Sequence, residues 1–275
     1  MSKIIGLLML FSLLFSGCRP PAPATPPPLA SKPAAIPLTL EPCSLAQATV
    51  KAECGELIVP EDRAHPEGRL LHLNIVVVRA RGKNPEPDPL FYLAGGPGGA
   101  ATRPDIVSTA NRILRVVNDE RDIVFVDQRG SNGTHRLTCD PIPDEIFNGP
   151  QQGINDWMAK CLAALDGDPR FYTTAEAMRD LDDARAALGY EKINLYGISY
   201  GVTAAQVYMR MFPGHVRTAV MDHGTALDLP FRYILPRASQ SALDQVFAYC
   251  DGNETCHAAY PDIRGDWQKV LNRLA

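Results

Sequence analysis

The stretch Gly-Ile-Ser-Tyr-Gly at residues 197–201 decides the fold of this chain, because it lies between two segments of different periodicity. Residues 193–196 form a short apolar run, as in a buried strand. In residues 202–212, by contrast, the apolar side chains recur at helical spacing, and this segment ends before Pro213. A backbone that turns from strand to helix within about two residues strains the central residue and lifts its side chain off the sheet. The sequence therefore predicts an α/β fold with Ser199 on a sharp turn.

The Ser199 turn carries a candidate nucleophile. Gly197 and Gly201 allow the strand and the helix to approach closely. The helix directs its unpaired N–H groups and positive dipole end toward charge that develops on an attacked carbonyl. Gly-x-Ser-x-Gly alone is a weak signal, but a capping box of Thr173 and Glu176 begins a helix just before the strand. We therefore interpret Ser199 as the nucleophile of a serine hydrolase.

A glycine-rich loop follows an earlier apolar strand at residues 89–93. Residues 94–99 read Ala-Gly-Gly-Pro-Gly-Gly, and the glycines leave backbone N–H groups accessible to a ligand. The loop lacks the Lys-Ser/Thr ending of a phosphate-binding loop. We expect it to supply one N–H group of an oxyanion hole, with the N–H of Tyr200 as the second.

A further apolar strand at residues 122–126 leads into Asp127-Gln128-Arg129-Gly130. A buried acid, amide and guanidinium beside an Asn-Gly turn can brace a loop through charge-assisted hydrogen bonds. We interpret this segment as support for the site without a part in the chemistry.

These three motifs, in this order, resemble the proline iminopeptidase and tripeptidyl aminopeptidase branch of the α/β-hydrolases. The resemblance extends from about Cys43 to the end of the chain. It implies that Ser199 is the nucleophile and that Gly96 and Tyr200 donate the oxyanion-hole N–H groups. Ala94 departs from the histidine that iminopeptidases often carry there, which favours the secreted, tripeptidyl-like relatives, and Ile198 stands where glycine is common.

The resemblance also implies a mostly parallel sheet with flanking helices and a helical cap. We expect the N-terminal part of the core at residues 43–227, with a strand at 216–221, and the start of the cap at 228–275. Within the cap, residues 238–249 and 265–274 read as helices.

The triad acid and histidine of such a hydrolase follow the cap, but only 76 residues follow Ser199. We therefore expect a C-terminally truncated chain that lacks both groups and the last strands. None of the six histidines lies at a post-cap position. Asp222 and His223, at the end of a strand, are interpreted as structural because the strand order is wrong for a triad.

The N-terminus predicts export from the cytoplasm. Residues 1–17 read as a signal peptide, because Lys3 precedes an apolar run too short to span a bilayer. The run ends in Phe-Ser-Gly-Cys, which resembles a bacterial lipobox, so we expect lipidation of Cys18; ordinary cleavage and an uncleaved anchor are the alternatives. Nine prolines among residues 19–42 predict an extended tether after the lipid, so that residues 18–42 link it to the core.

This arrangement predicts a lipid-anchored protein of the bacterial cell envelope or a secreted one. Arg19 after the lipidated cysteine favours the outer membrane, with the protein facing the periplasm. Six cysteines besides Cys18 fit an oxidising compartment. Their proximity suggests three disulfides, although six cysteines allow 15 pairings. The suggested pairs are Cys43 with Cys54, Cys139 with Cys161, and Cys250 with Cys256.

Composition limits the partners. A net charge of −4 without a basic cluster argues against nucleic acid, and the Cys and His spacings suit no metal site. We expect no cofactor. The leading hypothesis is an exopeptidase that cleaves peptides through an acyl-enzyme on Ser199. A carboxylesterase of the same fold and a non-catalytic envelope-binding lipoprotein are the alternatives, and the sequence predicts no oligomeric state.

Overall fold

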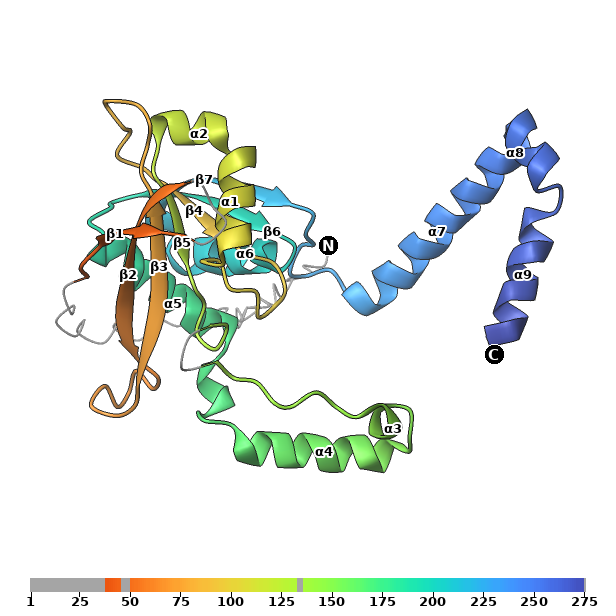
Figure 1. Cartoon of the computed structure of the whole chain (residues 1–275), viewed down its shortest axis with the longest axis horizontal. Coiled ribbons are helices and arrows are strands. Elements are labelled where there is room, and N and C mark those ends of the chain that lie inside the picture. The colour runs from red at the N-terminus through yellow and green to blue at the C-terminus, as the bar shows by residue number, and fades with distance from the viewer. Residues whose placement is uncertain (1–37, 46–49, 133–135, 275) are drawn as a thin grey trace, which may run out of the picture. The chain divides into compact units, whose positions relative to one another are not determined.

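The computed structural model describes residues 38–45, 50–132 and 136–274 of the chain. Within them lies a seven-stranded sheet with the strand order β1-β2-β3-β5-β4-β6-β7 (Figure 1). Strands β5, β4, β6 and β7 are parallel, and antiparallel pairing from β5 through β3 and β2 to β1 continues the sheet. The strands are β1 (Glu41–Ser44), β2 (Lys51–Pro60), β3 (Leu70–Val78), β4 (Leu90–Leu93), β5 (Ile123–Val126), β6 (Ile193–Ile198) and β7 (Val216–Asp222).

The apolar segments of the sequence form the expected strands. The runs expected at residues 89–93, 122–126, 193–196 and 216–221 form β4, β5, β6 and β7. All four residues of β5 are buried, as expected for a strand in a parallel sheet that is covered on both faces. The prediction of an α/β fold is confirmed.

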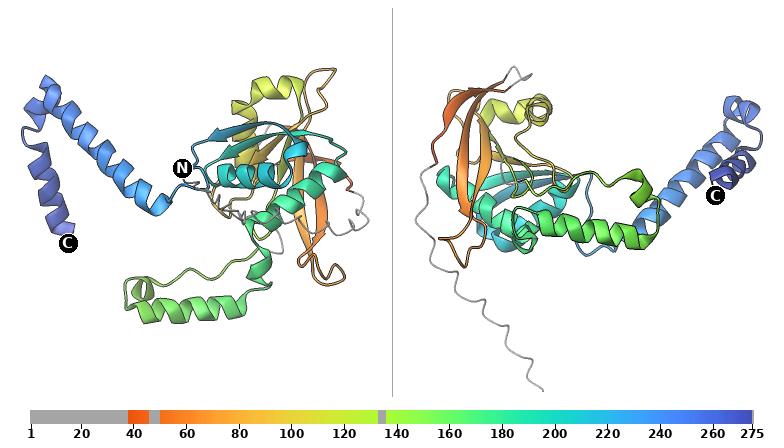
Figure 2. Two further views of the ribbon diagram at one scale, coloured as in Figure 1. Left: turned by 180° about the vertical axis from the view of Figure 1, so that it is seen from behind. Right: turned by 60° about the horizontal axis from the view of Figure 1, so that its bottom comes forward.

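Two hydrophobic clusters lie on opposite faces of the sheet. Alternation along β3 explains this division, because Ile75 and Val77 belong to one cluster and Val76 and Val78 to the other. The first cluster packs against α5 (Thr174–Ala187) and α6 (Tyr200–Met211), and the second packs against α1 (Pro104–Ile113), which α2 (Arg115–Glu120) follows. Figure 2 shows these helix pairs on the two sides of the sheet.

The start of α5 corrects one detail of the sequence analysis. The hydroxyl oxygen of Thr173 accepts a hydrogen bond from the N–H of Glu176 at 3.3 Å, as a capping box requires. The Glu176 carboxylate, however, forms ion pairs with Arg63 and Arg179, each at 3.3 Å. Two nearby guanidinium groups attract the carboxylate more strongly than one backbone N–H group.

Further helices lie between the strands and after β7. The chain between β5 and α5 contains α3 (Asp144–Phe147), α4 (Gln151–Ala164) and η2 (Pro169–Phe171), and η3 (Pro213–His215) precedes β7. The last elements are α7 (Phe231–Gly252), α8 (Glu254–Ala259) and α9 (Ile263–Leu274). The helices expected at residues 238–249 and 265–274 lie within α7 and α9. Helix α7 begins seven residues earlier than expected and contains Pro236.

Three disulfides connect neighbouring segments, and they are the pairs that sequence proximity suggests. Cys43–Cys54 joins β1 to β2, Cys139–Cys161 joins the segment before α3 to α4, and Cys250–Cys256 joins α7 to α8. Each closes a short loop, so each restricts a local segment.

The predictions for the N-terminus fall on residues 1–37, outside the described part of the chain. The signal peptide, the lipidated Cys18 and most of the proline-rich tether therefore stay predictions. In the part that the structure describes, no helix combines the length and apolar character needed to cross a membrane.

Candidate active site

Ser199 occupies the sharp turn between β6 and α6. Its backbone has φ 55° and ψ −119°, a conformation that residues with a side chain rarely adopt. Strain of this kind is common at functional sites, where the surrounding structure enforces it. The Ser199 side chain is exposed, whereas the β6 residues Ile193 and Leu195 are fully buried. The turn thus presents the hydroxyl at the carboxyl edge of the parallel strands.

The two glycines that flank this turn leave no room for a side chain. A Cβ atom on Gly201 would lie 2.1 Å from the carbonyl oxygen of Leu93, the last residue of β4. A Cβ atom on Gly197 would lie 2.3 Å from the carbonyl oxygen of Gly201. Both contacts are with backbone, which cannot rotate away. The glycines are therefore required for α6 to begin directly against the sheet.

We expect Gly201→Ala to lower the free energy of unfolding by about 3 kcal/mol, because the added methyl group overpacks a site walled by backbone. Gly214→Ala is the matched control, since a Cβ atom there meets no atom within 4 Å. Urea unfolding of both variants in the full-length protein measures the difference. Equal stabilities of the two variants would contradict the packing described for the turn.

The glycine-rich loop between β4 and α1 lies against Ser199. A Cβ atom on Gly95 would lie 3.2 Å from Cβ and 3.7 Å from Oγ of Ser199. Gly96 has a φ of 134°, and a Cβ atom there would lie 2.9 Å from the backbone nitrogens of Gly98 and Gly99. The structure therefore brings together the two segments that the sequence analysis paired.

Tyr200 begins α6 directly after the serine. Its N–H belongs to the first turn of the helix, where backbone N–H groups have no partner within the helix. Its hydroxyl lies 2.7 Å from Oγ1 of Thr174, the first residue of α5. This side-chain contact ties α6 to α5, and sequence reasoning missed it because the two residues are 26 positions apart.

Asp222 and His223 lie beside the turn at the end of β7. The N–H of Ser199 donates a hydrogen bond to the carbonyl oxygen of Asp222 at 2.9 Å. The Asp222 carboxylate accepts a hydrogen bond from the hydroxyl of Tyr196 at 2.5 Å and pairs with the His223 ring. The Tyr196 hydroxyl and His223 lower the pKa of Asp222, and the Asp222 carboxylate raises the pKa of Tyr196 to about 12.

The described contacts of Asp222 and His223 do not include the Ser199 hydroxyl. The His223 side chain is 85% exposed, and none of the described residues forms a hydrogen bond with the Ser199 hydroxyl. Other described histidines pair with carboxylates of their own surroundings: His65 with Asp62, His72 with Glu56, and His215 with Asp182. Among the described residues, the glycine-rich loop lies against Ser199, and no histidine forms a hydrogen bond with its hydroxyl.

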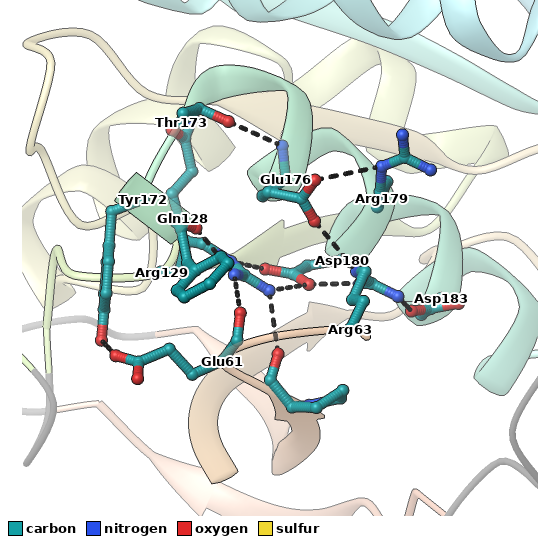
Figure 3. A network of polar contacts seen from close by, with 12 residues as sticks. Glu61, Arg63, Gln128, Arg129, Tyr172, Thr173, Glu176, Arg179, Asp180 and Asp183 are labelled. Atoms are coloured by element: carbon teal, nitrogen blue, oxygen red, sulfur yellow. Dashed lines mark hydrogen bonds and ion pairs between the residues drawn. The ribbon is translucent and has the colours of Figure 1, made fainter. Parts of the chain in front are cut away.

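A buried ion pair holds α5 against the sheet (Figure 3). The guanidinium of Arg129 donates to both carboxylate oxygens of Asp180 on α5, at 2.7 and 2.8 Å. It also donates to the carbonyl oxygens of Glu61 and Phe171, at 2.9 and 2.8 Å. The side chains of Arg129 and Asp180 are 1% and 2% exposed. The sequence predicts that Arg129 braces a loop, but it does not identify Asp180 as the acidic partner of Arg129.

The site has no set of metal ligands. Within residues 38–45, 50–132 and 136–274, no group of three or more His, Cys, Asp and Glu side chains is placed to hold a metal ion.

Comparison with known protein families matches residues 88–248, more than half of the chain, to the α/β hydrolase fold. This match begins just before β4, continues through the Ser199 turn and ends in α7. The chain belongs to the α/β-hydrolase family. The strained serine turn, the glycine-rich loop and the parallel strands that carry them are therefore parts of a hydrolase fold.

Two curated relatives that this chain resembles are peptidases by name. The tripeptidyl aminopeptidase of Streptomyces coelicolor is 32% identical over 186 residues, which cover 62% of this chain and 34% of the relative. Serine protease Hip1 of Mycobacterium tuberculosis is 26% identical over 243 residues, which cover 80% of this chain and 46% of the relative. The chain thus spans between a third and a half of these relatives.

Part of this chain is also similar to a solved structure. The proline iminopeptidase of Mycobacterium smegmatis is 18% identical and aligns with a TM-score of 0.39, covering 60% of this chain and 42% of that one.

Proposed function

We propose that this hydrolase is a serine aminopeptidase that releases short N-terminal pieces from peptides through an acyl-enzyme on Ser199. The observation that carries the proposal is the exposed serine at φ 55° on the β6–α6 turn, with the glycine-rich loop packed against it. The peptidase names of the relatives support peptides as substrates.

The proposed reaction begins with attack of the Ser199 Oγ on the carbonyl carbon of the scissile peptide bond. A histidine takes the hydroxyl proton, and the carbonyl oxygen becomes an oxyanion that accepts hydrogen bonds from the N–H groups of Gly96 and Tyr200. The carbon–nitrogen bond then breaks, and the amine leaves with the proton from the histidine. Water attacks the resulting ester and restores the serine.

The proton acceptor is not assigned to a described residue. His223 is exposed and paired with Asp222, whose carboxylate also accepts the Tyr196 hydroxyl. By the family resemblance, the triad acid and histidine belong to a part of the hydrolase beyond the helical cap. The assays below therefore use the full-length protein.

The proposal is tested by comparing three substrates with the full-length protein. These are a tripeptide p-nitroanilide with a free amine, the same compound N-acetylated, and a p-nitrophenyl ester. An aminopeptidase that recognises the free amine is expected to give a kcat/KM at least about tenfold higher for the first than for the second. Rapid ester hydrolysis with no cleavage of either anilide identifies a carboxylesterase instead. No hydrolysis of any compound supports a non-catalytic protein.

A further inference from the structure

Asp127 connects the end of β5 to the glycine-rich loop. It directly follows β5, and its side chain is buried, with 3% of the residue exposed. One carboxylate oxygen accepts the backbone N–H of Thr102 at 2.9 Å, and the other accepts the Thr102 hydroxyl at 2.7 Å. Both carboxylate oxygens therefore bind a single residue of the loop that leads from β4 to α1.

The remaining contacts of Asp127 fix the carboxylate itself. The side-chain amides of Asn132 and Asn74 donate to the second oxygen, at 2.9 and 3.2 Å. The N–H of Asp127 donates to the carbonyl oxygen of Asn74 at 3.0 Å. Four uncharged donors therefore bind this carboxylate, one at the first oxygen and three at the second. This buried acid is held by hydrogen bonds from three separate segments.

Thr102 lies where its contacts can fix the position of the glycine-rich loop. The residues between β4 and α1 include four glycines, which give the backbone little intrinsic stiffness. β4 fixes one end of this stretch at Leu93, and the Asp127 contacts fix Thr102 near the other end. Between these anchors, Gly95 packs against Ser199.

We propose that Asp127 is a positioning residue that holds the glycine-rich loop, and with it the N–H of Gly96, at the oxyanion position beside Ser199. This inference rests on the proposed function. Donors of an oxyanion hole act only within about 2.7–3.1 Å of the developing charge. A displacement of about 1 Å can lower the rate about a hundredfold.

The test replaces Asp127 by asparagine in the full-length protein. An amide presents a donor where the carboxylate presents an acceptor, so it cannot accept the Thr102 N–H, the Thr102 hydroxyl and both asparagine amides together. We expect kcat to fall about tenfold to a hundredfold, while KM changes by less than about threefold. We also expect faster amide hydrogen exchange in residues 95–102 than in the unmodified protein.

Asp88→Asn is the matched control. Asp88 is also a buried acid, 9% exposed, and accepts hydrogen bonds from Asn194 at 2.7 Å and Arg121 at 3.1 Å. It precedes β4, at the opposite end of that strand from the loop. We expect this variant to lose stability while its kcat and the exchange of residues 95–102 stay unchanged at a temperature where both variants are folded.

Three outcomes overturn the inference. These are an unchanged kcat in Asp127→Asn, unchanged exchange in residues 95–102, and an equal fall of kcat in both variants. If the unmodified protein has no hydrolase activity, the proposed function fails, whereas the exchange measurement still decides whether Asp127 holds the loop. Faster exchange in residues 95–102 of Asp127→Asn alone would then support the structural half of the inference.

Discussion

Ser199→Ala is expected to lower kcat of the full-length protein by a factor on the order of 10⁵–10⁶, since loss of a nucleophilic serine removes the covalent step. The fold should be retained, because the backbone N–H of residue 199 still donates to the Asp222 carbonyl oxygen and the exposed side chain makes no described hydrogen bond. Hydrolysis of the best substrate from the three-compound comparison measures the loss.

Ser239→Ala is the control for this variant. Ser239 is exposed on α7, so its hydroxyl can be removed with no expected effect on kcat. A Ser199→Ala protein that is folded and retains more than about a hundredth of kcat would contradict the assignment of the nucleophile. Loss of kcat in both variants would point to a common effect on folding, which circular dichroism would reveal.

The second large effect concerns the buried ion pair of Arg129 and Asp180. Arg129→Ala is expected to lower the free energy of unfolding by about 3–5 kcal/mol, because it leaves a buried carboxylate without its main partner. It also removes the donors to the carbonyl oxygens of Glu61 and Phe171. Arg63 still contacts Asp180 in this variant, but its side chain is 26% exposed and its attraction is more screened. Urea unfolding measures the loss.

An exposed ion pair provides the comparison for Arg129. Arg103 pairs with Asp105 at 2.9 Å, and these side chains are 59% and 56% exposed. Arg103→Ala is therefore expected to change the free energy of unfolding by less than about 1 kcal/mol. If both alanine variants lose a similar small amount, the ion pair on α5 is not the brace described here.

The sequence predicts the sharp strand-to-helix turn at Ser199 because the determinants of the turn are local. The turn needs a glycine two residues before and two residues after the serine, and the neighbouring strands are short apolar runs. Gly201 packs against Leu93 and Gly95 packs against Ser199, so steric contact explains why glycine occupies these two positions. Such a pattern is visible without knowledge of the distant chain.

The supporting contacts could not be predicted in the same way, because their partners are far apart in sequence. Arg129 and Asp180 are separated by 51 residues, and Asp127 and Thr102 by 25. Asp180 lies on a helix among other charged residues, where a partly solvated charge is the common interpretation. Glu176 shows the same limit, since distant Arg63 competes with the local capping interaction.

The most direct test of the central claim is to treat the full-length protein with a fluorophosphonate and map the adduct by peptide mass spectrometry. The reagent forms a phosphorus–oxygen bond to an activated serine with loss of fluoride, so the adduct identifies the nucleophile. We predict a single modified residue, Ser199, and no modification in Ser199→Ala. An adduct on another serine, or none in a protein that hydrolyses the test substrates, would contradict the assignment.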